Sequence, residues 1–170
     1  EIIGFSRNFI VQSRYPDGGS SYTSSAAYVS YRQDITQKST LNTGIRFTNT
    51  QLNAKWIDTT FITLPDMDIH LKNSAVTATV GYVYKPEESW KLSSVISSGF
   101  RSPNIDDIGK IREKSGKLTV PNINLKPEYV YNAEVGILKY LNEKRFNIGW
   151  SLYYTLLNNY IAREPFSVNG

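Results

Sequence analysis

Few residues in this chain of 170 could do chemistry, and most familiar active sites cannot be built from them. The sequence has no Cys and a single His, His70, so it excludes thiol nucleophiles and Cys-based metal sites and leaves little for imidazole catalysis. Asp106 and Asp107 are adjacent, and in an extended backbone their carboxyl groups would point in opposite directions rather than form an acid–base pair. We therefore expect neither enzyme activity nor a cofactor.

A divalent-cation site is the one metal chemistry that the sequence offers. Asp66, Asp68 and His70 alternate along the chain and would project to one side of an extended backbone. Solvated acidic loops are common, however, and three candidate ligands without supporting contacts are weak grounds for a metal site. We predict no metal site and expect His70 to contact a ligand or only solvent.

Composition favours strands. Aromatic residues make up 13% of the chain, and these residues are enriched in β-strands. No stretch approaches the roughly 18 consecutive apolar residues of a membrane-spanning helix. The net charge of +4 is mildly attractive to anions but too small and dispersed to imply a nucleic-acid partner.

Polar and apolar residues alternate with a period of two in several segments, which is typical of strands that have two different faces. In the clearest segment, Phe146, Ile148, Trp150 and Leu152 alternate with small or polar residues. The predicted strands are 22–35, 41–48, 75–85, 90–100, 129–141 and 145–158, and the first and fourth are rich in Ser, so their register is less defined.

The connections between these segments alternate in length. Short polar turns are predicted at 36–39, 86–89 and 142–144, and long loops at about 57–73 and 101–127. An antiparallel meander with tight turns at one rim and long loops at the other is the pattern of outer-membrane β-barrels. The segments also reach the ~9–11 residues that a tilted strand needs to cross a bilayer.

Charge placement agrees with a barrel wall. Arg46, Lys91 and Glu134 fall on the more polar side of their segments, and the one charge on the apolar side is Lys139, close to a turn, from which it could reach lipid headgroups. Aromatic residues collect near the predicted strand ends, as in the two interfacial girdles of such barrels. They are Tyr31, Tyr84, Trp90 and Phe146 beside the short turns and Phe47, Phe100 and Tyr129 towards the long loops.

A soluble or surface-attached β-sandwich is the alternative interpretation. The aromatic residues would then fill a core between two sheets, with Trp150 and Val80 sealed inside it. Such a module could bind glycans or act as an adhesin through exposed aromatic side chains such as Trp56.

Three motifs carry a resemblance to a known family. They are Phe100-Arg101-Ser102-Pro103-Asn104, then Asn122-Ile123-Asn124-Leu125-Lys126-Pro127-Glu128, then Tyr131-Asn132-Ala133-Glu134-Val135-Gly136. The chain resembles TonB-dependent outer-membrane receptors, which carry a Phe-Arg-Ala-Pro-Asn box, an Asn-Pro-Asn-Leu-Lys-Pro-Glu box and a Tyr-Asn-x-Glu-x-Gly strand in this order. Ser102 and Ile123 depart from the family pattern, and a loop tolerates both.

The resemblance implies a transmembrane barrel of about 22 strands with an N-terminal plug, in the outer membrane of a Gram-negative bacterium. Such receptors take up scarce ligands, here expected to be a ferric siderophore or haem, with energy delivered through TonB. About six strands are present, so residues 1–170 would be part of the barrel domain without the plug. The expected partners are outer-membrane lipid, the remaining barrel and plug, and TonB only through the missing N-terminal part; the isolated fragment should self-associate.

The candidate ligand contacts are Arg101, Asn104, His70 and Lys114. Lys114 lies in a basic stretch, 110–117, that could attract an anionic ferric chelate or lipopolysaccharide phosphate, although a solvated loop is the simpler interpretation. Haem receptors of the family often carry a His between the two boxes, and 104–121 contains none.

A structural role for the boxes is favoured over direct ligand contact. Pro103 and Pro127 would interrupt the strand ladder at either end of the loop, and Leu125 could anchor the returning chain. Glu134 could pair with Arg46, with Lys91 or with the plug.

Overall fold

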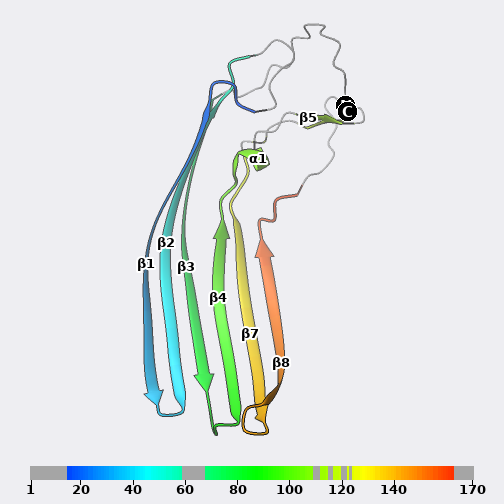
Figure 1. Cartoon of the computed structure of the whole chain (residues 1–170). Helices are drawn as coiled ribbons and strands as arrows, with labels where there is room; N and C mark the ends of the chain where they lie inside the picture. Colours follow the sequence, from blue (N-terminus) through cyan, green and yellow to red (C-terminus); the bar gives the residue numbers. More distant parts are fainter. Residues whose placement is uncertain are drawn as a thin grey trace. The chain divides into compact units, whose positions relative to one another are not determined.

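The computed structural model describes residues 15–58, 68–108, 112–114, 117–119, 122 and 124–162. Their main feature is a single six-stranded sheet in which the strands lie in the order β1-β2-β3-β4-β7-β8 (Figure 1). The strands are β1 (Ser20–Thr36), β2 (Ser39–Lys55), β3 (Asp68–Tyr84), β4 (Trp90–Arg101), β7 (Glu128–Leu141) and β8 (Phe146–Asn158). The predicted all-β meander is confirmed.

The segment between β4 and β7 holds the remaining regular structure. It contains the short helix α1 (Ile105–Ile108) and a small antiparallel sheet of β5 (Arg112–Lys114) and β6 (Lys117–Thr119). In the described residues no helix has the length and apolar character needed to cross a membrane.

The chain divides into two compact units. The loop unit comprises Glu1–Thr23, Gln51–Leu71 and Asn104–Leu125. The sheet unit comprises Ser24–Thr50, Lys72–Pro103 and Lys126–Gly170. Strands β1, β2 and β3 contribute residues to both units, whereas β4, β7 and β8 belong to the sheet unit.

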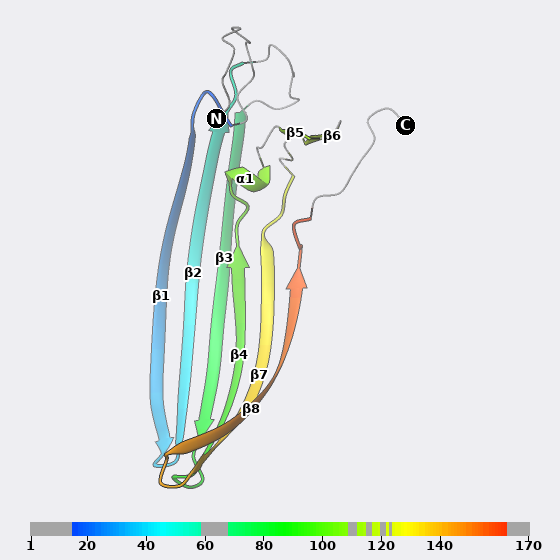
Figure 2. The same cartoon turned by 45° about the vertical axis from the view of Figure 1, so that its right-hand side comes forward.

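Short turns join three pairs of strands at one end of the sheet unit, as the sequence predicts (Figures 1 and 2). In the turn between β7 and β8, Asn142, Glu143 and Lys144 all have positive φ angles of 48°, 55° and 70°. Two hydrogen bonds tie the other two turns together: the Lys38 ammonium donates to the Pro86 carbonyl at 2.6 Å, and the Lys85 N–H donates to the Lys38 carbonyl at 2.7 Å.

The strand register sorts the side chains of the sheet unit into two faces. One row pairs Val80 with Ile96, Ile96 with Ala133, and Ala133 with Tyr154. Because adjacent residues of a strand point to opposite faces, the next row belongs to the other face. That row is Gly81, Val95, Glu134 and Tyr153.

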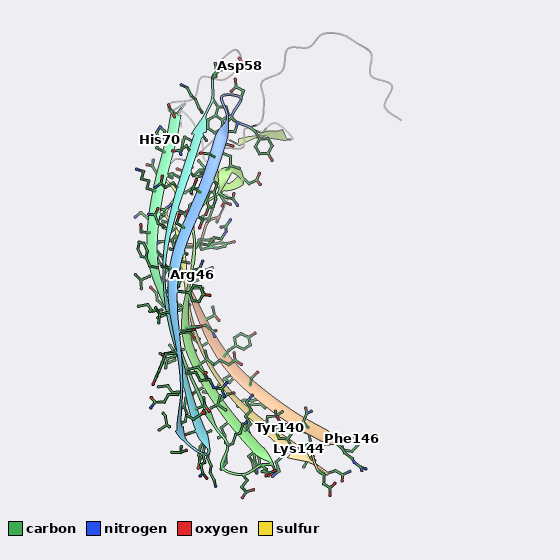
Figure 3. All side chains as sticks on the ribbon, turned by 60° about the vertical axis from the view of Figure 1, so that its left-hand side comes forward. Arg46, Asp58, His70, Tyr140, Lys144 and Phe146 are labelled. Carbon is green, nitrogen blue, oxygen red and sulfur yellow. The ribbon has the colours of Figure 1, made fainter. Side chains whose placement is uncertain are left out.

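The apolar face remains uncovered. Trp150 is 61% exposed and Val80 is 49% exposed, and the sheet unit contains no second sheet among its described residues. Seen along its edge in Figure 3, the sheet carries side chains on both sides. The sandwich interpretation required these two residues to be sealed in a core and is therefore wrong.

Two predicted loop boundaries need correction. Strand β3 begins at Asp68, so 68–73 are strand rather than the end of a loop, while 59–67 lie outside the described residues. The sequence obscured this start because Lys72, Asn73 and Ser74 break the apolar alternation. The predicted loop 101–127 also contains regular structure, namely α1, β5 and β6.

Candidate functional site

A hydrophobic cluster organises the loop unit. Leu52, Ala54 and Trp56 follow one another at alternate positions and are buried together with Ile69 and Ile108. Partly buried apolar side chains pack against this cluster, namely Leu71, Ile105 and Leu125. Alternation of apolar residues at the end of β2 and the start of β3 thus creates a surface against which Ile105, Ile108 and Leu125 pack. The sequence prediction that Leu125 anchors the returning chain agrees with this packing.

Trp56 lies at the centre of the cluster with 1% of its surface exposed. The sandwich interpretation used it as an exposed, glycan-binding aromatic residue, which the burial contradicts. Its indole Nε1 is buried and has no hydrogen-bond partner among the residues that the structure describes.

Asp17 fastens the start of the described chain to the end of β2. Its two carboxylate oxygens accept hydrogen bonds from the N–H groups of Ile57 and Asp58, each at 2.9 Å. The hydrogen bond from the Ile57 N–H is the main reason that the pKa of the Asp17 carboxyl lies below its ordinary value. The sequence analysis missed this role of the Asp17 side chain.

Asn104 caps helix α1. Its side-chain oxygen accepts a hydrogen bond from the Asp107 N–H, and the Asp107 carboxylate accepts one from the Asn104 N–H, both at 3.0 Å. This reciprocal pair satisfies backbone donors at the start of the helix. A residue that the sequence offered as a ligand contact is therefore occupied as a helix cap.

The neighbouring acids also have local partners. The Tyr15 hydroxyl donates a hydrogen bond to Asp106 Oδ1 at 3.1 Å. Asp106 and Asp107 lie in a helix rather than in the extended backbone that the sequence analysis assumed. Adjacent helical residues do not face each other.

His70 lies between two acceptors within the loop unit. Nδ1 is 2.7 Å from Asn53 Oδ1, and Nε2 is 3.1 Å from Asp68 Oδ1. On β3 it alternates with Ile69 and Leu71, so its side chain lies on the side away from the hydrophobic cluster. Asp66 lies outside the described residues, and the described part of the chain contains no group of three or more His, Cys, Asp or Glu residues that could hold a metal ion.

The first two sequence boxes meet in the sheet unit. The register pairs Arg101 with Glu128 and Phe100 with Tyr129. Arg101 Nη1 donates to Glu128 Oε2 at 2.7 Å, and the Phe100 and Tyr129 rings lie 5.5 Å apart. We call Phe100, Arg101, Glu128 and Tyr129 the motif clamp.

The motif clamp also fixes the end of β8. Glu128 Oε1 accepts a hydrogen bond from the Ile161 N–H at 2.8 Å, so one carboxylate links three segments. The Asn159 amide donates to the Pro127 carbonyl at 3.3 Å. The Glu128 side chain is only 12% exposed, which makes these bonds part of the fold rather than a solvated surface pair.

The other motif residues occupy structural positions. Pro103 is fully buried just after β4, and Pro127 lies just before β7, so both prolines fall outside the strand ladder, as predicted. Asn122 donates its N–H to the Ile108 carbonyl at 3.0 Å and accepts the Asn124 N–H at 2.9 Å. Lys126 is exposed.

The third motif lies on β7. Glu134 is exposed and lies opposite Val95 and Tyr153 in the register. The predicted ion pair of Glu134 with Arg46 or Lys91 is not formed, and Arg46 instead donates to Thr48 at 3.1 Å. Gly136 is packed closely, because a Cβ there would lie 2.9 Å from the Ser93 hydroxyl.

Lys114 lies in β5, opposite Lys117 in the register. The placement of its side chain lies outside what the structure describes. Of the four candidate ligand contacts, the structure therefore gives Arg101 and Asn104 structural partners and places His70 away from the hydrophobic cluster. Arg101 belongs to the sheet unit, whereas Asn104, His70 and Lys114 belong to the loop unit.

The two-faced meander and the motif clamp define a β-barrel wall. A scan against protein-family models matches residues 3–170 to the β-barrel of TonB-dependent-receptor-like proteins. The chain belongs to this family, whose members are receptors of the outer membrane of Gram-negative bacteria.

One solved structure with a similar fold is a double mutant of the Serratia marcescens hemophore receptor HasR in complex with its hemophore HasA and heme. The similarity has a TM-score of 0.70 at 16% sequence identity and covers 82% of this chain. It covers 26% of the HasR chain, so the present chain spans about a quarter of that receptor's length. At this identity the likeness shows the fold alone. No curated protein matches the chain.

Proposed function

We propose that this chain is a wall segment of a TonB-dependent outer-membrane receptor that takes up an iron-containing ligand, a ferric siderophore or haem. Its short turns would lie in the periplasm, and the long connections between β2 and β3 and between β4 and β7 would lie outside the cell. Residues 1–170 would belong to the barrel domain, with the plug and the TonB-contacting segment supplied by other parts of the receptor.

The two faces of the sheet unit carry this proposal. Water would penalise an exposed face of Ile96, Tyr154 and Trp150 by roughly 25 cal/mol for each Å² of apolar surface, whereas lipid tails would not. The opposite face, with Asn132, Glu134 and Ser151, suits a water-filled lumen. The strands have 12 to 17 residues, which is more than the ~9–11 that a bilayer requires.

A ferric siderophore is favoured over haem as the ligand of this segment. Haem iron needs an axial ligand, and the only His, His70, already has an acceptor within 3.1 Å of each ring nitrogen. Lys114 also lies in a basic stretch, 110–117, that could attract an anionic chelate. Lys114 and His70 remain our candidate contacts, and Arg101 and Asn104 act mainly as structural residues.

Two single-cysteine variants on β8 of the full receptor test whether the sheet is a barrel wall. Ser151→Cys should react with a water-soluble maleimide through the lumen, whereas Leu152→Cys should react at least tenfold more slowly because lipid covers it. Equal rates at the two positions would contradict the proposal.

The experiment that tests the ligand is iron uptake by cells in which the receptor gene is deleted and restored. Restored cells should take up radioactive iron from a ferric siderophore only when TonB is present. If the restored cells take up iron only when haem is its source, the preference for a siderophore is wrong. If they take up iron without TonB, the proposed receptor function is wrong.

The isolated chain should not behave as a soluble monomer. In the described part of the chain, strands β1 and β8 each have one unpaired edge in the sheet, and no other element covers the apolar face. We expect self-association or a need for detergent in size-exclusion chromatography. A clean 19.3 kDa species without detergent would contradict the wall proposal.

A further inference from the structure

We propose that Lys139, Trp90 and Ser89 form a binding site for the phosphate of an anionic glycerophospholipid at the short-turn end of the sheet unit. This inference rests on the proposed function, because it requires the apolar face to contact lipid. It adds a site for one class of lipid headgroup to a face whose other expected contacts with lipid are apolar.

Lys139 is the one charged residue on the apolar face of β4, β7 and β8 in the described structure. Its register row is Trp90, Lys139 and Ile148, the row nearest the turn between β3 and β4. A cation in this place has to reach the polar edge of the membrane, since the alternative is a charge among lipid tails.

The side chain of Lys139 is held in that direction by two contacts. Nζ donates a hydrogen bond to the Ser89 hydroxyl at 3.0 Å and lies 4.3 Å from the centroid of the Trp90 ring. Ser89 is itself fixed beside β7, because its carbonyl accepts the Tyr140 N–H at 2.8 Å. The ammonium group is therefore positioned before any ligand arrives.

An ammonium group has three N–H donors, and these contacts use two directions. The third N–H of Lys139 has no acceptor in the described structure, so a phosphate oxygen can take it. The Ser89 hydroxyl also donates weakly to Glu87 Oε2 at 3.4 Å, and this is the acid that a phosphate would have to compete with.

The surroundings suit a whole lipid rather than a free anion. Exposed Phe146 and Ile148 lie beside Lys139 on the apolar face and can contact acyl chains, and Figure 3 shows Phe146 with Tyr140 and Lys144 at this end of β7 and β8. Nearby, Lys144 Nζ lies 3.2 Å from Glu88 Oε2, so this acid is paired with another cation and does not compete with a phosphate for Lys139. The three turns and adjoining strand ends carry six basic residues against four acidic ones, namely Lys38, Lys85, Lys91, Lys139, Lys144 and Arg145 against Asp34, Glu87, Glu88 and Glu143.

The test uses the full receptor with Ile148→Cys as its sole cysteine, labelled with a fluorophore and reconstituted in phosphatidylcholine vesicles. Brominated phosphatidylglycerol or brominated phosphatidylcholine is added as a quencher, and the ratio of their local binding constants is measured. A single basic residue near an anionic surface should favour phosphatidylglycerol by about fivefold.

Lys139→Gln should bring this ratio close to one, and Lys139→Arg should retain it. The matched control is Lys91→Gln, because Lys91 adjoins Trp90 but lies on the opposite face, and it should leave the ratio unchanged. Glu87→Gln should raise the ratio. Water-soluble glycerol phosphate should not compete, since it lacks the acyl chains.

Each alternative outcome has a distinct meaning. If neither brominated lipid quenches the label, the face does not contact lipid and the proposed wall fails together with this site. If both lipids quench equally in the unmodified receptor, or if Lys91→Gln lowers the ratio as much as Lys139→Gln does, the wall stands and the Lys139 site is overturned. Displacement by glycerol phosphate would show a free-anion site and overturn the lipid assignment.

Discussion

The two units of this chain place their large apolar side chains in opposite ways. In the loop unit, Trp56 is 1% exposed and packs with Leu52, Ile69 and Ile108. In the sheet unit, Trp150 is 61% exposed on a face that no other described element covers. The same residue type is therefore buried within the protein in one unit and left exposed on a sheet face in the other.

The polar contacts differ in the same way. In the loop unit, side chains satisfy backbone donors, as Asp17 does for Ile57 and Asp58. In the sheet unit, neighbouring strands pair through their backbones, and side chains add single acceptors, as Glu128 does for the Ile161 N–H and Ser98 does for the Ala78 N–H. Irregular backbone needs such local partners because it has no ladder to satisfy its polar groups.

The largest effect should come from Trp56→Ala. Removing a fully buried aromatic side chain usually costs about 3–5 kcal/mol, so the free energy of local opening of the loop unit should fall by that amount. Hydrogen exchange of the Leu52, Ala54 and Ile69 amides in the full receptor measures it. Trp150→Ala is the matched control and should leave these amides unchanged; an equal effect of both substitutions would remove the distinction between the units.

The second effect concerns the motif clamp. Glu128→Ala should lower the stability of the receptor in detergent by about 1–3 kcal/mol, because it leaves the Ile161 N–H and the Arg101 guanidinium without this acceptor. Thermal unfolding measures it.

The control for the motif clamp is Glu88→Ala. Glu88 is 92% exposed in its pair with Lys144, and exposed pairs contribute about 0–1 kcal/mol. If Glu88→Ala proves as costly as Glu128→Ala, the motif boxes have no special structural role.

The third prediction is a pH dependence in the loop unit. The folded-state pKa of Asp17 is lowered, chiefly by the hydrogen bond from the Ile57 N–H, so its contribution to stability is present above the ordinary carboxyl pKa and is lost as pH falls through the lowered value. The Ile57 and Asp58 amides should therefore be protected from hydrogen exchange at neutral pH and should lose that protection in acid.

Asp17→Asn provides the comparison for this pH dependence. It should weaken the protection at neutral pH and flatten the dependence in acid, because the amide cannot ionise. An unchanged acid profile in this variant would show that another group controls the opening.

The smallest effect on stability is expected for His70→Gln. His70 lies on the side of β3 away from the hydrophobic cluster and is exposed, so the unfolding free energy should change by no more than about 0.5 kcal/mol. The variant is therefore a clean test of ligand contact: a loss of siderophore affinity at unchanged stability would confirm it, and unchanged affinity would remove His70 from the candidate contacts.

Much of the sheet unit could be predicted from local pattern. The alternation of Phe146, Ile148 and Trp150 identified a strand and its apolar side without any knowledge of its neighbours. The same reasoning found the three short turns, because turn residues and strand period are local properties. It gave the position of Lys139 near a turn, although not its contacts with Ser89 and Trp90.

The loop unit was harder to predict. Asn104 was offered as a ligand contact and caps α1, and Trp56 was offered as an exposed aromatic and is buried. Glu134 was offered Arg46 or Lys91 as an ion-pair partner, and it pairs with neither. In each case the side chain's role depends on residues distant in the sequence or on a backbone conformation that alternation does not encode.

The sequence by itself determined the strand period, the two faces and the order of the motifs, since each follows from the spacing of residue types along a single strand or turn. Only the tertiary structure decided that the two boxes meet through Arg101 and Glu128, that β3 starts at Asp68, and that Ile108 packs in one cluster with Trp56. The physical reason is that register and burial are set by pairing and packing between segments, which no single segment specifies.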